Sequence, residues 1–228
     1  MNVSELAKFL QTYNGRDKVI RTLCYGTKWA SGVVSSPTAA KKLNSFSSQM
    51  SACRATLRLL DDIPMLDCTL SYGLGRQEQD GVLRFIGVLS NFLDQIFYPI
   101  DHYAWFVEND YITVKNNPWS TISTAFWVIS VYLALMRALR SITVLQYHKR
   151  CLKGVDCDVS LALSQLLVQQ RREFLSIIRC CLDLVHSVSC LPEGYLWGGK
   201  LSRWQVGAVG TLSSLLGLYM ALSRRSSS

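Results

Sequence analysis

The 228-residue chain lacks the sequence patterns that mark common enzyme active sites. It contains no P-loop, GxGxxG fingerprint, GxSxG nucleophile elbow or HExxH zinc motif. The adjacent carboxylates Asp61 and Asp62 could form a metal or acid–base pair, but neighbouring helical positions face about 100° apart. Glu173 and His186 have no nucleophile beside them. The sequence therefore predicts a protein without catalytic activity, metal or cofactor.

A secretory signal and a disulfide framework are also missing. Glu5 and Lys8 interrupt any apolar core that a signal peptide would need. The eight cysteines form no CxxC pair and no repeating spacing, and the three histidines stand apart from any pair of cysteines. We therefore expect reduced thiols and neither disulfides nor zinc.

Charged residues are scarce, and two long stretches have none. They make up 18% of the chain, against about 25% in a typical soluble domain. Residues 116–136 and 204–223 carry no charge at all, and arginines follow or bracket both stretches. A bilayer core of about 30 Å requires about 20 helical residues to cross it. The sequence therefore predicts two transmembrane helices.

The positive charge of the chain gathers beside these stretches. The net charge is +8, yet residues 1–118 hold 12 Lys and Arg against 11 Asp and Glu, while residues 137–203 hold 10 against 5. This distribution favours anionic lipid headgroups as partners, and no nucleic-acid-binding module is present. By the positive-inside rule the 137–203 segment would be cytosolic, which places both termini in the lumen.

Apolar periodicity outside the uncharged stretches predicts helices throughout. The expected fold class is all-α: a helical membrane protein with N-terminal amphipathic helices and two transmembrane helices. The expected regions are an amphipathic, interfacial helical region over 1–115, transmembrane helices over 116–136 and 204–223, a basic loop over 137–203 with an apolar helix near 160–190, and a short basic tail over 224–228.

Local signals predict where several helices end. Asn14-Gly15 would break a first helix over 4–13, and Pro64 would end or kink the third helix. A polar loop is expected over 149–159.

Two apolar helices, near 79–98 and 160–190, contain charges and are expected to be buried or partly inserted in the membrane. The pair in the second helix is spaced four residues apart, which would lower the cost of immersion. These charged residues are Arg84 and Asp94 in the first helix, and Arg179 and Asp183 in the second.

The third helix, about 39–61, has the most regular apolar stripe. Its members recur every three or four residues and oppose a face rich in serine and arginine. The stripe consists of Leu43, Phe46, Met50, Cys53, Leu57 and Leu60. Three interpretations remain open: packing against neighbouring helices, insertion into a membrane interface, or a coiled-coil partner.

The last uncharged stretch contains small residues at a spacing typical of close helix packing. They form two small-xxx-small pairs: Gly210 with Ser214, and Ser213 with Gly217. The alternative is a helix that merely tolerates small residues.

Several segments resemble the peroxisomal membrane protein 11 family, in order along nearly the whole chain. The residues that match its opening and third-helix motifs are Gly15, Arg16, Asp17, Lys18, Arg54 and Arg58. Further segments are similar to the gamma form of animals: Leu59-Leu60-Asp61-Asp62, Tyr72-Gly73-Leu74-Gly75, Asp94-Gln95-Ile96-Phe97-Tyr98-Pro99 and Leu191-Pro192-Glu193-Gly194.

The resemblance implies a multi-pass peroxisomal membrane protein with cytosolic termini that elongates the organelle before division. It implies insertion of the third helix into one leaflet, where burial of six apolar side chains at about 1.5–3 kcal/mol each would supply on the order of 10 kcal/mol before ordering costs. The implied partners are peroxisomal membrane lipids, further copies or relatives of the chain, tail-anchored fission adaptors and a dynamin-related GTPase. A pore for small metabolites is the alternative, based on the four charges within apolar helices.

Overall fold

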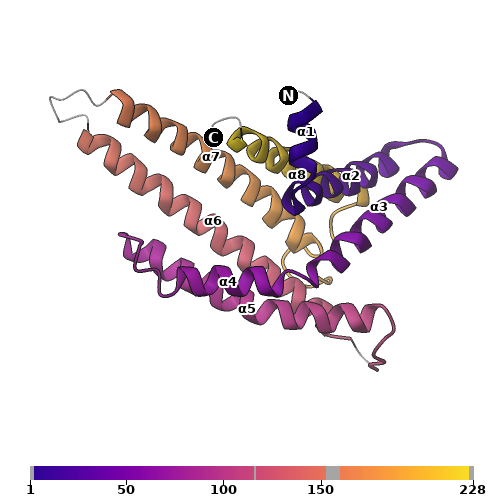
Figure 1. Ribbon diagram of the computed structural model, residues 1–228. Helices are drawn as coiled ribbons and strands as arrows, with labels where there is room; N and C mark the ends of the chain where they lie inside the picture. The colour runs from indigo at the N-terminus through magenta and orange to yellow at the C-terminus, as the bar shows by residue number, and fades with distance from the viewer. Residues whose placement is uncertain (1–2, 116, 153–159, 226–228) are drawn as a thin grey trace.

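The computed structural model describes residues 3–115, 117–152 and 160–225, which form helices and no strand (Figure 1). This confirms the all-α fold class. The helices are α1 (Val3–Leu10), α2 (Tyr13–Val33), α3 (Pro37–Arg58), α4 (Asp62–Tyr72), α5 (Gly81–Glu108), α6 (Trp119–Leu152), α7 (Ser160–Ser189) and α8 (Arg203–Arg225).

The helices pack in an order that differs from their order in the sequence. Each of α3, α2, α8, α7, α6, α5 and α4 packs on the next, so the C-terminal helix lies between α2 and α7 (Figure 1). α2 and α8 run antiparallel, because Trp29 lies against Gly207 while Tyr25 lies against Gly210. The start of α2 is therefore beside the end of α8.

α6 is much longer than the span predicted from the sequence. It has 34 residues, or about 51 Å at 1.5 Å per residue, and only its first half is uncharged. The helix continues to Leu152, so residues 149–152, which were expected to begin a polar loop, are helical instead. The rest of the predicted loop, residues 153–159, lies outside the residues that the structure describes. α7 then returns along α6, so the 137–203 segment consists mostly of helix (Figure 1).

The interior of the protein contains polar side chains beside its apolar core, and many large apolar side chains are exposed. Large side chains such as Phe85 and Phe92 of α5 are 66% and 61% exposed. The buried polar side chains are Ser47, Ser123, Asp183, His186, Ser187, Ser213 and Ser214. Exposed apolar side chains in this number suit a surface that faces lipid.

Two of the described helices, α6 and α8, are long and apolar enough to cross a membrane. They correspond to the two stretches predicted from the sequence. Only 17% of the most apolar window of α6 and 39% of that of α8 is buried inside the protein, so neither is the enclosed core helix of a soluble fold. Their outward faces suit a lipid environment.

The first helix break lies earlier than predicted, between α1 and α2 at Gln11-Thr12. Thr12 caps α2 by accepting a hydrogen bond from the backbone N–H of Gly15 at 3.2 Å. Gly15 lies inside the first turn of α2 rather than ending a helix. A Cβ atom at this position would overlap the backbone carbonyl oxygen of Phe9, so the junction requires glycine.

Neither Pro64 nor Pro99 ends a helix. α3 stops at Arg58, and Pro64 lies in the first turn of α4, where its missing N–H forfeits no helical bond. α5 was expected to end at residue 98, yet it continues through Pro99 to Glu108. A turn follows α4, where Gly73 and Gly75 both have positive φ values.

Candidate functional site

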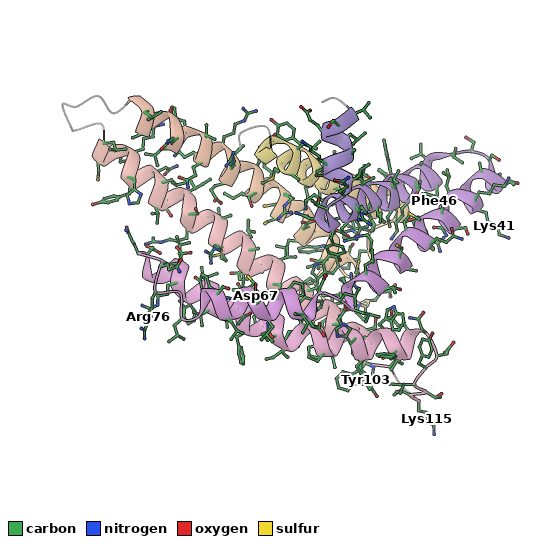
Figure 2. The ribbon with its side chains drawn as sticks, in the orientation of Figure 1. Lys41, Phe46, Asp67, Arg76, Tyr103 and Lys115 are labelled. Atoms are coloured by element: carbon green, nitrogen blue, oxygen red, sulfur yellow. The ribbon has the colours of Figure 1, made fainter. Side chains whose placement is uncertain are left out.

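The apolar stripe of α3 lies on the outside of the protein. None of its six residues is buried: Phe46 is 40% and Leu60 75% exposed, Cys53 is exposed, and the other three are half-buried. Leu60 lies in the turn after α3, because the helix ends at Arg58 and not at residue 61 as predicted. α3 itself is well defined, because Ser36 caps it and Pro37 occupies its first position. Figure 2 places Phe46 along α3, in the part that follows Lys41. Phe46, Cys53 and Leu60 are thus available to lipid or to a partner, whereas the three half-buried members of the stripe are partly covered by the rest of the chain.

The opposite face of α3 packs inward through polar contacts. Ser47 is buried and donates a hydrogen bond to the Cys24 carbonyl of α2 at 2.8 Å. Arg54 pairs with Asp17 of α2 at 2.7 Å, and Arg58 pairs with Asp101 of α5 at 3.1 Å. α3 is therefore attached to the other helices through its hydrophilic side.

The residues of the family motif contribute to these junctions. Arg16 donates from its guanidinium to the carbonyls of Leu10 and Gln11, at 2.9 and 3.2 Å, and so closes the end of α1. Asp17 is the partner of Arg54, and Lys18 lies on the same turn of α2. The motif thus joins α1, α2 and α3.

A buried ion pair joins α2, α7 and α8. Asp183 of α7 accepts hydrogen bonds from Arg21 of α2 and from Ser213 of α8. The predicted pairing of Arg179 with Asp183 is wrong, because Arg21 supplies the cation from another helix. Arg179 lies beside Gly217 instead, and its Nε has no hydrogen-bond partner. Sequence reasoning missed Arg21, since nothing local indicates a partner 162 positions away.

The small residues of α8 face these neighbours. Gly210 lies against the Tyr25 ring, and Ser214, which is buried, donates to the Gly210 carbonyl at 2.6 Å. Ser213 joins the ion pair, and Gly217 faces α7. Sequence reasoning did not single out Gly207, although a Cβ atom there would approach the backbone N of Trp29 in α2 to 2.5 Å.

A second junction attaches the start of α5 to α6. Asp80 caps α5 by accepting from the N–H groups of Val82 and Leu83, and it also accepts two hydrogen bonds from Arg140 at 2.6 and 3.1 Å. The Arg140 guanidinium, helped by the capping N–H groups, lowers the pKa of Asp80 to about 2. Arg137 pairs with Glu78 nearby.

The charges that suggested a pore do not meet along one path. Arg84 donates to the Leu74 carbonyl at 2.8 Å, and Asp94 accepts from Ser130 of α6 at 2.8 Å. Asp183 is engaged with Arg21 in a different junction. The pore is accordingly not the favoured function.

A cavity of about 680 Å³ lies behind the polar face of α3. Residues from α2, α3, α5, α6, α7 and α8 line it, including Tyr25 and His186, whose side chains form a hydrogen bond of 3.0 Å. No sequence motif indicated this cavity, because six helices assemble it. Among the described residues no group of three or more His, Cys, Asp or Glu could hold a metal, and seven cysteines are free thiols; Cys157 lies outside those residues.

An all-α chain with two helices long and apolar enough to cross a membrane, and with many large apolar side chains exposed, has the features of a helical membrane protein. The family model described as Peroxisomal biogenesis factor 11 (PEX11) matches residues 3–222. The chain belongs to the PEX11 family.

Named relatives cover the same length. Peroxisomal membrane protein 11C of Homo sapiens is 36% identical over 230 residues, covering 96% of this chain and 94% of that protein. Peroxisomal membrane protein 11C of Mus musculus is 34% identical over 228 residues, with the same coverage. No solved structure matches. The chain is accordingly a peroxisomal membrane protein of a family that acts in peroxisome proliferation and division.

Proposed function

We propose that the chain elongates the peroxisomal membrane by inserting the apolar stripe of α3 into one leaflet. The observation that carries this proposal is the placement of α3. Ser47 and Arg54 attach it to α2 through polar contacts, while Phe46, Cys53 and Leu60 of the stripe stay exposed. Added area in one leaflet favours curvature, and the two spanning helices keep α3 at the membrane. The mechanism requires no catalytic residue.

Single substitutions on α3 test this mechanism. In cells that lack the endogenous family members, the wild-type chain should elongate peroxisomes, and Phe46→Glu should reduce that elongation because a carboxylate opposes insertion. Ser45→Glu is the matched control, since Ser45 is exposed on the same helix but belongs neither to the stripe nor to the cavity lining. Equal elongation by both variants at equal membrane levels would sink the mechanism.

Partners of the chain are part of the same proposal. We infer from the resemblance that it assembles with further copies or relatives, and that it assists tail-anchored adaptors and a dynamin-related GTPase. Crosslinking in isolated peroxisomes should recover these proteins with both the wild-type chain and Phe46→Glu. Loss of all partners in an otherwise stable Phe46→Glu variant would instead make the stripe a protein-binding surface.

The proposed topology places both termini in the cytosol. The antiparallel pairing of α2 with α8 brings the start of α2 and the end of α8 to one side, and the end of α6 and the start of α7 lie far from residues 191–202 (Figure 1). This grouping requires α7 and one helix before α6 to cross the membrane in addition to α6 and α8. Lys149, Arg150 and the basic C-terminal end then share one side of the membrane. The positive-inside rule, applied to this divided 137–203 segment, agrees with the family resemblance.

A further inference from the structure

The 680 Å³ cavity behind α3 is large enough for a small ligand and is rich in hydrogen-bond donors. Its wall combines the polar face of α3 with the first turns of α6 and the first residue of α8. Trp105 and Trp127 also line it. Tryptophan is enriched at the depth of lipid headgroups, and the starts of both spanning helices lie at this wall.

Five cations line the cavity, and three of them already have carboxylate partners. Arg21 pairs with Asp183, Arg54 with Asp17 and Arg58 with Asp101. The remaining two, Lys28 and Arg203, have no carboxylate within ion-pair distance among the residues that the structure describes. Glu108 also lines the cavity, is exposed, and forms no ion pair within the described chain.

Further donors in the wall lack acceptors. The Arg21 Nε is buried and has no hydrogen-bond partner. The hydroxyls of Ser48 and Ser51 line the same space from α3 and form no hydrogen bond within the described residues. An ammonium, guanidinium N–H groups and hydroxyls together match the oxygens of a phosphate group, which accepts several charge-assisted hydrogen bonds at once.

We propose that this cavity binds a phosphate-bearing anion, with Lys28 and Arg203 as the principal cations and Ser48 and Ser51 as supporting donors. The bound group is either the headgroup of a phospholipid that enters from the bilayer or a soluble phosphate ester. Either occupant would join α2, α3 and α8 at the membrane surface. This site is separate from the outward stripe of α3 and does not rest on the proposed insertion mechanism.

Binding to the purified full-length chain in a neutral detergent tests the proposal. The probes are short-chain phosphatidic acid, glycerol 3-phosphate, inorganic phosphate, and a diacylglycerol with the same chains as a phosphate-free control. Stoichiometry is measured by native mass spectrometry and affinity by calorimetry. We expect one phosphate-bearing probe to bind per chain, and the Lys28→Gln/Arg203→Gln double variant to bind it at least tenfold more weakly.

The variants and probes separate the outcomes. Lys200→Gln is the matched control, because Lys200 is exposed nearby but does not line the cavity; it should bind like wild type. If the double variant fails to fold, Arg203→Gln alone replaces it in the binding measurement, because this change affects only an exposed side chain. Binding of phosphatidic acid alone assigns a lipid occupant, and binding of glycerol 3-phosphate or phosphate assigns a soluble one. No binding, equal binding of diacylglycerol, or unchanged affinity in the cavity variants would overturn the proposal.

Discussion

Asp183 is the residue with the largest expected effect on stability, since it receives donors from two other helices. Arg21→Met would leave this carboxylate buried without its cation, and removing one partner of a buried pair costs about 3–5 kcal/mol. The double variant Arg21→Met/Asp183→Leu removes both charges and should recover much of that loss. Unfolding of the detergent-solubilised protein measures both.

Arg179→Met provides the comparison for this prediction. Arg179 is an arginine of the same helix as Asp183, but it does not share the ion pair. Its replacement should therefore cost much less stability than Arg21→Met. If Arg21→Met/Asp183→Leu were no more stable than Arg21→Met, the loss would not come from an unpaired buried charge, and this prediction would be wrong.

The partner of Asp183 shows what a single sequence can indicate at the residue scale. A carboxylate in an apolar helix predicted that some cation must neutralise it, and this part was right. The identity of the cation followed only from tertiary packing, because a helix shows its own i, i+4 neighbours and not those of other helices. The inward polar face of α3 was unpredictable for the same reason: periodicity defines two faces but does not say which one meets the protein.

Helix α8 packs closely on α2 at positions where α8 has glycine. A Cβ at Gly207 would approach the backbone N of Trp29 to 2.5 Å, and backbone atoms cannot move aside cheaply. We predict that Gly207→Ala destabilises the protein by about 1–3 kcal/mol through overpacking, despite the better helix propensity of alanine. Thermal unfolding in detergent is the measurement.

Gly217→Ala is the matched control for Gly207→Ala, because Gly217 lies on the same helix but faces α7. Its Cβ would lie 3.6 Å from the Arg179 side chain, which is ordinary van der Waals contact. This variant should be neutral or slightly stabilising. If the two variants unfold alike, the α2–α8 contact is not as close as described.

The junction of α5 with α6 predicts a dependence on acid. Asp80 is ionised in the folded protein down to a pKa of about 2, against about 3.9 for an unperturbed aspartate. Its contribution is therefore complete above pH 4 and is lost as the pH falls toward 2, where protonation removes the ion pair with Arg140. Wild type should exceed Asp80→Asn in melting temperature at pH 7, and this difference should shrink between pH 4 and 2.5.

Arg76→Gln controls for a general effect of surface charge, because Arg76 forms no ion pair within the described residues and lies in the same connection. Its difference from wild type should not change over that interval. A constant difference between wild type and Asp80→Asn would show that capping rather than charge explains the stability.

Element types were more predictable than element ends. The 3.6-residue period indicated nearly every helix, and the two uncharged stretches identified α6 and α8. The ends depend on individual hydrogen bonds instead: Thr12 starts α2 two residues before Asn14-Gly15, and α6 extends past its uncharged half because α7 packs along it. Such contacts are not visible in composition.

On the scale of the whole molecule, the order of packing determines which segments share a side. The prediction from the sequence was one basic loop over residues 137–203, between two transmembrane helices. In the structure α6 and α7 occupy most of that segment and run in opposite directions, so residues 149–152 at the end of α6 lie far from residues 191–203 after α7 (Figure 1). Arg76 and Lys115 likewise lie at opposite ends of α5 in Figure 2. A count of charges along the sequence could not separate these groups.

This arrangement leads to a topology prediction that an external protease can test on intact peroxisomes. A specific cleavage site placed at either terminus or beside Lys149 should be cut without detergent, whereas the same site beside Lys200 should be protected and cut only after solubilisation. An undivided cytosolic loop over 137–203 requires the opposite grouping, with Lys149 and Lys200 accessible together and both termini protected. Cleavage at Lys200 on intact organelles would therefore refute the division of this segment by α7, even if α6 and α8 both cross the membrane.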